Sequence, residues 1–186
     1  APTAGTIKVN GSSTINAWYN GNVTIEAVNG SDSLSQHAST TVNITSITSN
    51  TTGTTVTVTT TDKAGNSSTR NYTIKIDKTQ PTCSFGTLSY LGVNTTATID
   101  LTCTNTVSGI SDKQLTASDF IVSNATITNV SRTTVTNGYK YTITLKGTTA
   151  GTSTVTLPSN KVTTVAGLGN AAKTSGSITI TNVSLS

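Results

Sequence analysis

Residues 96 to 103 read TATIDLTC, and an apolar side chain occupies every second position of this run. Because successive side chains of a β-strand point to opposite faces, such alternation is typical of a strand with one buried and one exposed face. The same alternation returns along the chain, for example in VTIEA at 23–27 and in YTITL at 141–145. Apolar residues at helical spacing are absent. The sequence therefore predicts an all-β protein.

Short turn signals separate these alternating runs. Asn-Gly pairs occur at 10–11, 20–21, 29–30 and 137–138. Short strands with Asn and Gly turns between them favour antiparallel sandwiches or barrels. Only 33% of the 186 residues are hydrophobic and only 4% are aromatic, which is little material for one large core. Two small sandwiches fit this composition better.

An internal repeat divides the chain into two halves. Thr-Thr, Gly-Asn and a closing Ile-x-Ile follow one another at identical spacing in 59–76 and in 163–180, and we predict a strand, a Gly-Asn turn and a closing strand in both stretches. Self-similarity at a fixed spacing indicates an array of related units. Ala-Pro-Thr at 1–3 is likewise echoed by Gln-Pro-Thr at 80–82, and proline stiffens the chain there. We predict two tandem β-sandwich domains, 1–80 and 81–186, with a short linker.

Charge and hydropathy exclude several classes of function. Charged residues make up 10% of the chain, and the net charge is +4. Lysines and arginines are scattered rather than clustered, so we expect no nucleic-acid binding. The sequence has no run of about 18 apolar residues, so we expect no membrane contact by this fragment. The linker-like residues 1–3 suggest a piece of a longer protein whose anchoring signals lie elsewhere, and we expect a monomer.

Three phrases stand out in the first half, WYNGNVT at 18–24, TDKAGN at 61–66 and IDKTQPT at 76–82. They resemble bacterial immunoglobulin-like (Ig-like, Big-type) repeat domains of cell-surface proteins and adhesins, which implies that the two predicted sandwiches are Ig-like. The second half resembles a related bacterial Ig-like family through LTASDFIVSNAT at 115–126, YKYT at 139–142 and GNAA at 169–172. The resemblance covers nearly the whole chain and implies β-sandwiches stacked in long surface proteins. The second half lacks the acidic residue that its family carries before the Ala-Gly-Asn turn.

The resemblance implies a non-catalytic spacer or stalk module of an extracellular bacterial surface or secreted protein, in particular an adhesin. Its partners would be neighbouring Ig-like repeats of the same chain. Two alternatives remain open at this point. One is an adhesin module that binds a glycan or a host protein, and the other is an accessory module of a secreted carbohydrate-active enzyme.

Cys83 and Cys103 each alternate in step with the apolar residues of their predicted strands, so both side chains are expected to point inward. The midpoint between them is residue 93, close to an expected reversal of the chain near residues 91–94. A reversal there would set the two cysteines opposite each other on neighbouring strands, within reach of a disulfide. Oxidation is expected outside the cell. The sequence leaves a disulfide and two buried free thiols as the alternatives.

Asp62, in the TDKAGN phrase, is a candidate for a role other than packing. Together with Asp77 it could contribute to a Ca²⁺ site, which requires six to eight oxygen ligands. The alternative is a turn in which the Asp62 side chain bonds nearby backbone. Because the chain has only seven acidic residues, the turn is the favoured interpretation. We expect no metal site and no cofactor.

The remaining reactive side chains do not form a catalytic pattern. His37 is the only histidine and lies in what we interpret as a polar loop, and neither a nucleophile elbow nor a phosphate-binding loop occurs. We therefore expect no enzyme activity. Lys8 and Glu26 point outward by alternation, which argues against an intramolecular isopeptide bond. Trp18 and Tyr19 are interpreted as a cap on the core rather than as a sugar-binding platform.

Overall fold

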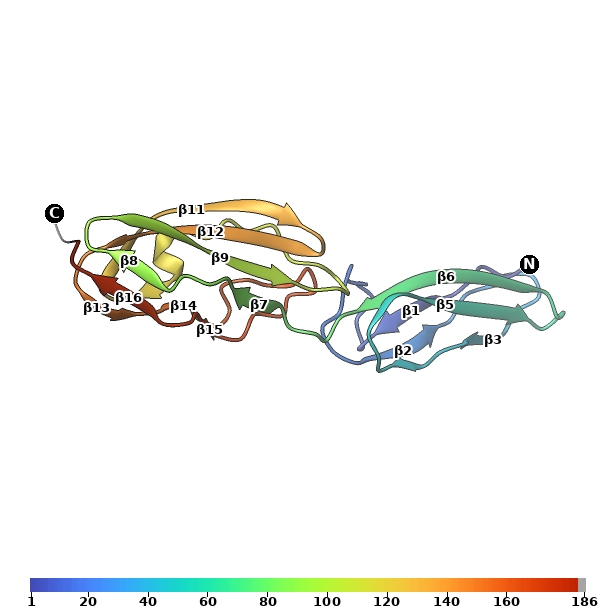
Figure 1. Ribbon diagram of the computed structural model, residues 1–186. Coiled ribbons are helices and arrows are strands. Elements are labelled where there is room, and N and C mark those ends of the chain that lie inside the picture. The colour runs from blue at the N-terminus through green and yellow to red at the C-terminus, as the bar shows by residue number, and fades with distance from the viewer. Residues whose placement is uncertain (184–186) are drawn as a thin grey trace. The chain divides into compact units, whose positions relative to one another are not determined.

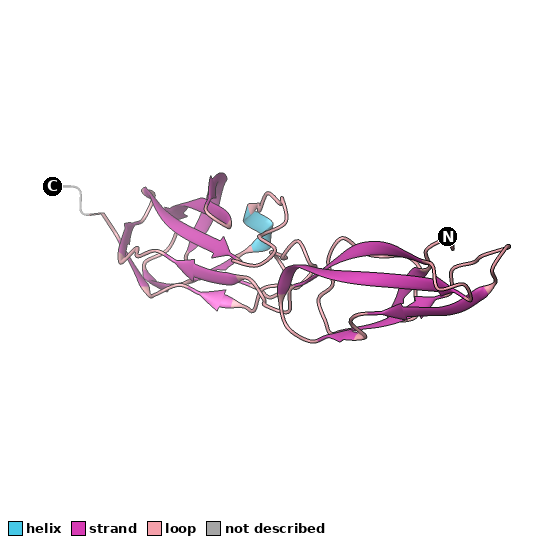
Figure 2. Cartoon of the chain, turned by 90° about the vertical axis from the view of Figure 1, so that its right-hand side faces the viewer, coloured by secondary structure: helices cyan, strands magenta, loops and turns pink. Residues whose placement is uncertain are grey.

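The computed structural model describes residues 1–183 (Figure 1). It divides into two compact units, unit 1 from Ala1 to Lys78 and unit 2 from Thr79 onward. This division falls two residues before the boundary predicted from the proline at position 81. Strands make up most of the regular structure of both units, and unit 2 also contains a 3₁₀ turn, η1, at Ala117–Asp119 (Figure 2).

Unit 1 consists of two three-stranded sheets. The first has the order β1-β2-β4 and the second the order β3-β5-β6 (Figure 1). Their bounds are Thr6–Val9 for β1, Val23–Val28 for β2, Ser46–Ile47 for β4, His37–Val42 for β3, Thr51–Asp62 for β5 and Ser67–Ile76 for β6. All the strand pairs in these two sheets are antiparallel.

The core of unit 1 follows the predicted parity. Both sheets turn their aliphatic positions inward, so that side chains from each sheet fill the space between them. The fully or nearly fully buried members are Ile7, Val9, Val23, Ile25, Val56, Val58, Ile74 and Ile76. Intervening Thr and Lys residues lie on the outer faces, as in the alternating burial of β1. Burying each aliphatic side chain contributes about 1.5–3 kcal/mol, which closes a small sandwich around few residues.

Unit 2 contains a four-stranded sheet of order β11-β12-β9-β7 and two three-stranded sheets, β13-β16-β8 and β10-β14-β15. Figure 1 shows β9, β11 and β12 in one layer and β8, β13, β14 and β16 in the other. The bounds are Thr82–Phe85 for β7, Tyr90–Gly92 for β8, Thr96–Thr104 for β9, Ile121–Val122 for β10, Ala125–Val135 for β11, Gly138–Gly147 for β12, Gly151–Ser153 for β13, Val155–Leu157 for β14, Lys173–Thr174 for β15 and Ile178–Thr181 for β16.

A second, separate core lies between these layers. It is built from inward residues of nearly every strand of unit 2, among them Ile99, Leu101, Tyr141, Leu157 and Ile178. Each unit therefore is a β-sandwich closed around its own core. The all-β tandem architecture predicted from the alternation and the repeat, and the Ig-like fold that the resemblance implied, are correct. The largest buried side chain is Tyr141, whose hydroxyl donates to the Lys113 carbonyl oxygen at 2.8 Å.

The internal repeat is only partly reproduced in the structure. Residues 51–76 form one long hairpin, β5–β6. The matching part of unit 2 leaves its strand after Leu157 and forms no strand again until β15. Pro158 has no backbone N–H to continue a ladder. The strand predicted at 163–164 is present only as two isolated antiparallel bridges, Thr163 with Gly169 and Thr164 with Ile110. The closing strand predicted at 178–180 is present as β16.

Candidate functional site

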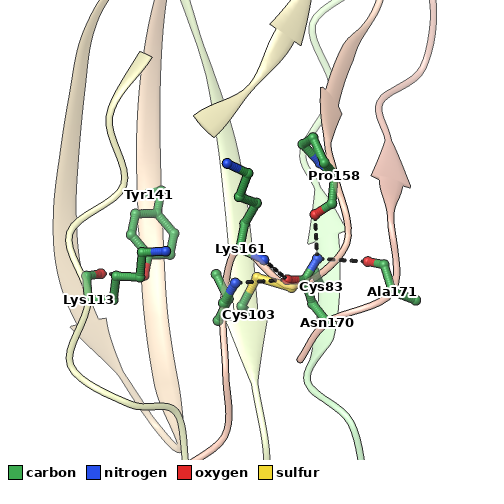
Figure 3. The surroundings of a disulfide bond; sticks show 9 residues. Cys83, Cys103, Lys113, Tyr141, Pro158, Lys161, Asn170 and Ala171 are labelled. Carbon is green, nitrogen blue, oxygen red and sulfur yellow. Dashed lines mark hydrogen bonds between the residues drawn. A yellow bond between two sulfur atoms is a disulfide. The ribbon is translucent and has the colours of Figure 1, made fainter. Parts of the chain in front are cut away.

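Cys83 on β7 lies directly opposite Cys103 on β9. Their Sγ atoms are bonded at 2.06 Å, and the Cα atoms are 4.1 Å apart (Figure 3). The β7–β9 ladder keeps the symmetry about residue 93 that the sequence suggested. The chain does not make a simple hairpin, however, because the segment between the two strands crosses to the other layer and pairs there as β8 with β16.

The surroundings of the disulfide include Asn170, a buried asparagine with four hydrogen bonds (Figure 3). Its Oδ1 accepts from the backbone N–H groups of Lys161 and Val162, each at 2.8 Å. Its Nδ2 donates to the carbonyl oxygens of Pro158 at 3.0 Å and Ala171 at 2.8 Å. The carboxamide thus uses both its donors and both its acceptor positions. It organises the loop 158–172, in which β-pairing is limited to isolated bridges.

Asp62 ends β5 and holds the hairpin turn. Its Oδ1 accepts from the Asn66 backbone N–H at 2.9 Å, and its Oδ2 accepts from Asn66 Nδ2 at 3.0 Å. The hydrogen bond from the Asn66 side chain, followed by backbone hydrogen bonds, holds the pKa of the Asp62 carboxyl below its usual value against the opposing effect of burial. The turn interpretation of the TDKAGN phrase is therefore correct.

The structure does not bring Asp77 to Asp62. Asp62 adjoins the turn end of the β5–β6 hairpin, where Thr61 pairs with Ser67, whereas Asp77 follows Ile76, which pairs with Thr51 at the other end. At about 3.4 Å per residue along a strand the two carboxylates are roughly 30 Å apart. The hypothesis of a Ca²⁺ site shared by these two residues is wrong. In residues 1–183 no three His, Cys, Asp or Glu side chains are grouped to hold a metal ion.

Tyr19 and Trp18 lie beside the end of β6. Tyr19 is buried, its backbone N–H donates to the Lys75 carbonyl at 2.9 Å, and its own carbonyl accepts from the Asp77 N–H at 2.9 Å. Trp18 is half-buried, and Lys75 Nζ lies 5.6 Å from the centre of its ring. Tyr19 belongs to the core of unit 1 and Trp18 carries a cation over its ring, which favours the interpretation of the two residues as a cap on the core.

His37 is not in a loop, contrary to the sequence interpretation. It begins β3 and pairs with Asp62 across the sheet. Its Nε2 forms a hydrogen bond with Thr40 Oγ1 at 2.9 Å. Lys8 and Glu26 both point outward, as predicted, and face each other across β1 and β2.

One hollow in unit 2 was missed by the sequence reasoning. It has a volume of about 450 Å³ and is lined mainly by β8, the start of β9 and residues 182–183. Tyr90 and Val183 stand on it as large exposed apolar residues, 58% and 53% accessible. The only sequence signal was an aromatic residue in a polar stretch before the predicted reversal.

The chain is similar to known proteins in its structure and not in its sequence. No protein-family model matches the chain. No curated protein matches its sequence. In the described part of the chain no helix is long and apolar enough to cross a membrane.

Three solved structures illustrate the likeness. Domains 4 and 5 of the S-layer protein SbsC are 14% identical, with a TM-score of 0.38, and the match covers 97% of this chain and 98% of that one. A three-Ig fragment of titin is 8% identical, with a TM-score of 0.49 and coverage of 98% and 66%. The sialic acid binding region of a Streptococcus sanguinis SK1 adhesin is 22% identical, with a TM-score of 0.35 and coverage of 78% and 38%. The strand pairing and the two separate cores define the fold of the chain.

Proposed function

We propose that this chain is a non-catalytic spacer module of an extracellular bacterial surface or secreted protein, built from Big-type Ig-like repeats. The observation that carries the proposal is the path of the chain through each unit. In both units the chain enters at one pole of the sandwich and leaves at the opposite pole.

In unit 1 the chain enters beside the turn of the β5–β6 hairpin. The backbone N–H of Thr3 donates to the Ser31 carbonyl at 2.7 Å, and that of Gly5 donates to Thr60 Oγ1 at 2.9 Å, near the end of β5. The chain leaves after Ile76, which pairs with Thr51 at the start of β5. The two points are separated by about nine residues of strand, or roughly 30 Å.

Unit 2 has the same property, measured along β9. On entering, Thr82 pairs with Thr104 at the end of β9, and Asn105 Nδ2 donates to the Thr79 carbonyl at 2.9 Å. On leaving, the Thr181 carbonyl accepts from the Val93 N–H at 2.8 Å, three residues before β9 begins. The chain thus passes along the full length of β9.

This path has a mechanical consequence. Domain termini often lie close together, and such a domain adds little length when it is inserted into a chain. A unit entered and left at opposite poles adds its whole length, and each further unit extends the array. The partners expected from this arrangement are neighbouring Ig-like units of the same protein.

The disulfide supports an extracellular location. Structural disulfides persist in oxidising compartments such as the cell surface and are rare in the cytosol. Cys103 is fully buried and Cys83 nearly so, so that a reductant has little access to the bond in the folded unit.

A reach experiment tests the spacer proposal. The chain is placed between a surface anchor and a small binding reporter, and the matched control replaces it by a flexible Gly/Ser linker of equal residue number. The folded chain should present the reporter to a tethered target beyond the range of the linker. Equal reach for both, or the same reach after one unit is deleted, would contradict the proposal.

The hollow beside Tyr90 supports a second candidate function, the binding of a glycan or host protein by an adhesin module. Its volume lies within the range of small-molecule sites, and an exposed aromatic ring can stack on a sugar. Glycan-array binding by the full chain that is lost in Tyr90→Ala and kept in Ile121→Ala, another exposed apolar residue of unit 2, would establish it. Absence of binding at every glycan would remove the glycan as a ligand and leave only a host protein.

A further inference from the structure

Four Asn-Gly pairs occur in the chain, at 10–11, 20–21, 29–30 and 137–138. Such a pair can deamidate because glycine has no side chain to shield its backbone nitrogen, which attacks the preceding carboxamide carbon. The attack needs a glycine N–H and an asparagine side chain that are not held elsewhere, and it needs room for a five-membered ring. The four Asn-Gly pairs differ in how far their surroundings in the structure meet these requirements.

Two of the pairs are enclosed by backbone. The Gly30 N–H donates to Thr40 Oγ1 at 3.2 Å, and a side-chain carbon at Gly30 would lie 2.0 Å from the Thr3 carbonyl oxygen. Gly138 pairs with Val135 on one side and Thr104 on the other. A side-chain carbon there would lie 2.0 Å from the Cys103 carbonyl oxygen. Rotation at Gly30 would break its hydrogen bond to Thr40, and rotation at Gly138 would break its sheet contacts.

The third pair has space but is held by hydrogen bonds. No heavy atom lies within 4 Å of where a side-chain carbon of Gly11 would be. Asn10 Oδ1, however, accepts from the Thr24 N–H at 2.8 Å, and the Asn10 N–H donates to the Thr24 carbonyl at 2.9 Å. Asn10 also has a φ of 51° within its turn. Its carboxamide carbon reaches the Gly11 nitrogen only after these bonds break.

Asn20–Gly21 has none of these restraints. Asn20 is exposed, and among residues 1–183 neither its side chain nor the Gly21 N–H has a hydrogen-bond partner. No heavy atom lies within 4 Å of where a side-chain carbon of Gly21 would be. Both reacting groups are free, and the space that the ring needs is open.

We propose that Asn20 is the principal deamidation site of this protein. The Gly21 nitrogen bonds to Cγ of Asn20, its proton leaves with the side-chain amide nitrogen as ammonia, and a succinimide forms. Water then opens the ring at one of its two carbonyl carbons. The products are aspartate or isoaspartate at position 20, with one water consumed, one ammonia released and no change of oxidation state.

The position gives this modification a structural effect. Residues 20–22 are the only connection between Tyr19, which is bonded to both Lys75 and Asp77 at the end of β6, and Val23, which begins β2 in the core. Isoaspartate adds one carbon to the backbone of this short connection. The longer connection weakens the hydrogen bonds of Tyr19 to Lys75 and Asp77, at the pole where the chain leaves unit 1.

The test is an ageing experiment on the full chain in mildly alkaline buffer, followed by peptide mapping. Each deamidation adds about 1 Da, and mapping assigns it to one of the four pairs. We expect Asn20 to react at least about tenfold faster than the other three, since each of them must first break hydrogen bonds or ladder contacts. In urea-unfolded chain the four rates should converge.

Two variants act as controls. Gly21→Ala, at a position with open space, should slow the reaction at residue 20 without altering the fold, and Asn20→Gln should abolish it there. A faster reaction at Asn10, Asn29 or Asn137 in the folded chain would overturn the proposal. So would a rate order that is unchanged by unfolding, because the folded structure would then not be the cause.

Discussion

The two copies of the internal repeat, 51–76 in unit 1 and 155–180 in unit 2, share several buried aliphatic positions and one buried polar position, and they differ in the structure built around that polar position. Thr60 and Thr164 occupy matching places, and both are completely buried. In unit 1 the strand continues past Thr60 to Asp62, whose carboxylate holds Asn66 across the turn. In unit 2 Ala166 stands where Asp62 would be, and residues 155–180 do not form a long hairpin like β5–β6.

The difference shows how one polar group can replace another. The anchor of the unit 1 turn is an aspartate that accepts hydrogen bonds from an exposed asparagine. Without an aspartate, unit 2 turns its own asparagine inward, and Asn170 holds the loop with four hydrogen bonds. A carboxylate can only accept, whereas a carboxamide can satisfy both N–H and carbonyl groups. The asparagine is therefore suited to a loop that has lost ladder partners of both kinds.

The largest effect is expected for Asn170→Ala. Two backbone N–H groups and two carbonyl groups lose their partner inside the unit, which should lower the free energy of unfolding of unit 2 by about 4 kcal/mol. Urea unfolding measures the change, with Asn66→Ala in unit 1 as the matched control. Asn66 is exposed, so its variant should cost clearly less. Equal losses in the two variants would mean that the two turns are anchored alike.

Removing the disulfide tests whether unit 2 depends on a constraint that unit 1 lacks. Cys83→Ser combined with Cys103→Ser opens a loop whose ends are 20 residues apart, and should cost unit 2 about 3 kcal/mol. The transition of unit 1 should not move and serves as the internal control. Before mutation, thiol labelling of the denatured, unreduced chain should find no free cysteine. Two labelled thiols would contradict the bond.

The hydroxyl groups of the two matching buried threonines should contribute differently to the free energy of unfolding of their units. Thr60 Oγ1 accepts from the Gly5 N–H at 2.9 Å and bonds Thr40 Oγ1 at 3.0 Å, whereas Thr164 Oγ1 accepts from the Leu168 N–H at 3.0 Å. Thr60→Val should cost unit 1 about 2 kcal/mol and Thr164→Val should cost unit 2 about 1 kcal/mol. Thermal unfolding of each variant measures both. The reverse order would show that bonds within the loop matter more than bonds between strands.

The smallest effect concerns pH. Because the pKa of Asp62 is lowered in the folded unit, its contribution is present at pH values above the unfolded pKa and is lost as the pH falls through the lower folded pKa. The stability of unit 1 should therefore decrease in acid more steeply than that of Asp62→Asn. Urea midpoints across the acidic range measure the two slopes. Identical slopes would mean that the Asp62 charge is not linked to folding.

Much of the fold was accessible from the sequence because its signal is local. Alternation predicted which side chains of β5, β6, β9 and β12 are buried, and the common symmetry about residue 93 set Cys83 opposite Cys103. The crossing of β8 to the other layer was not predicted, since its parallel pairing with β16 joins residues about ninety positions apart. The hypothesis of a site formed by Asp62 and Asp77 was wrong because the two residues lie at opposite ends of the β5–β6 hairpin. The sequence alone does not show which strands pair or where their ends meet.

By itself the sequence determined the strand-forming pattern, the division into two units and the inward parity of each core, because these depend on the period of the backbone and on which side chains avoid water. Only the tertiary structure decided which strands pair, that Asn170 takes the place of an acidic anchor, and that Asn20 alone among the Asn-Gly pairs is left unrestrained. Those outcomes depend on hydrogen-bond partners brought from distant parts of the chain, and no local pattern specifies which partners will meet.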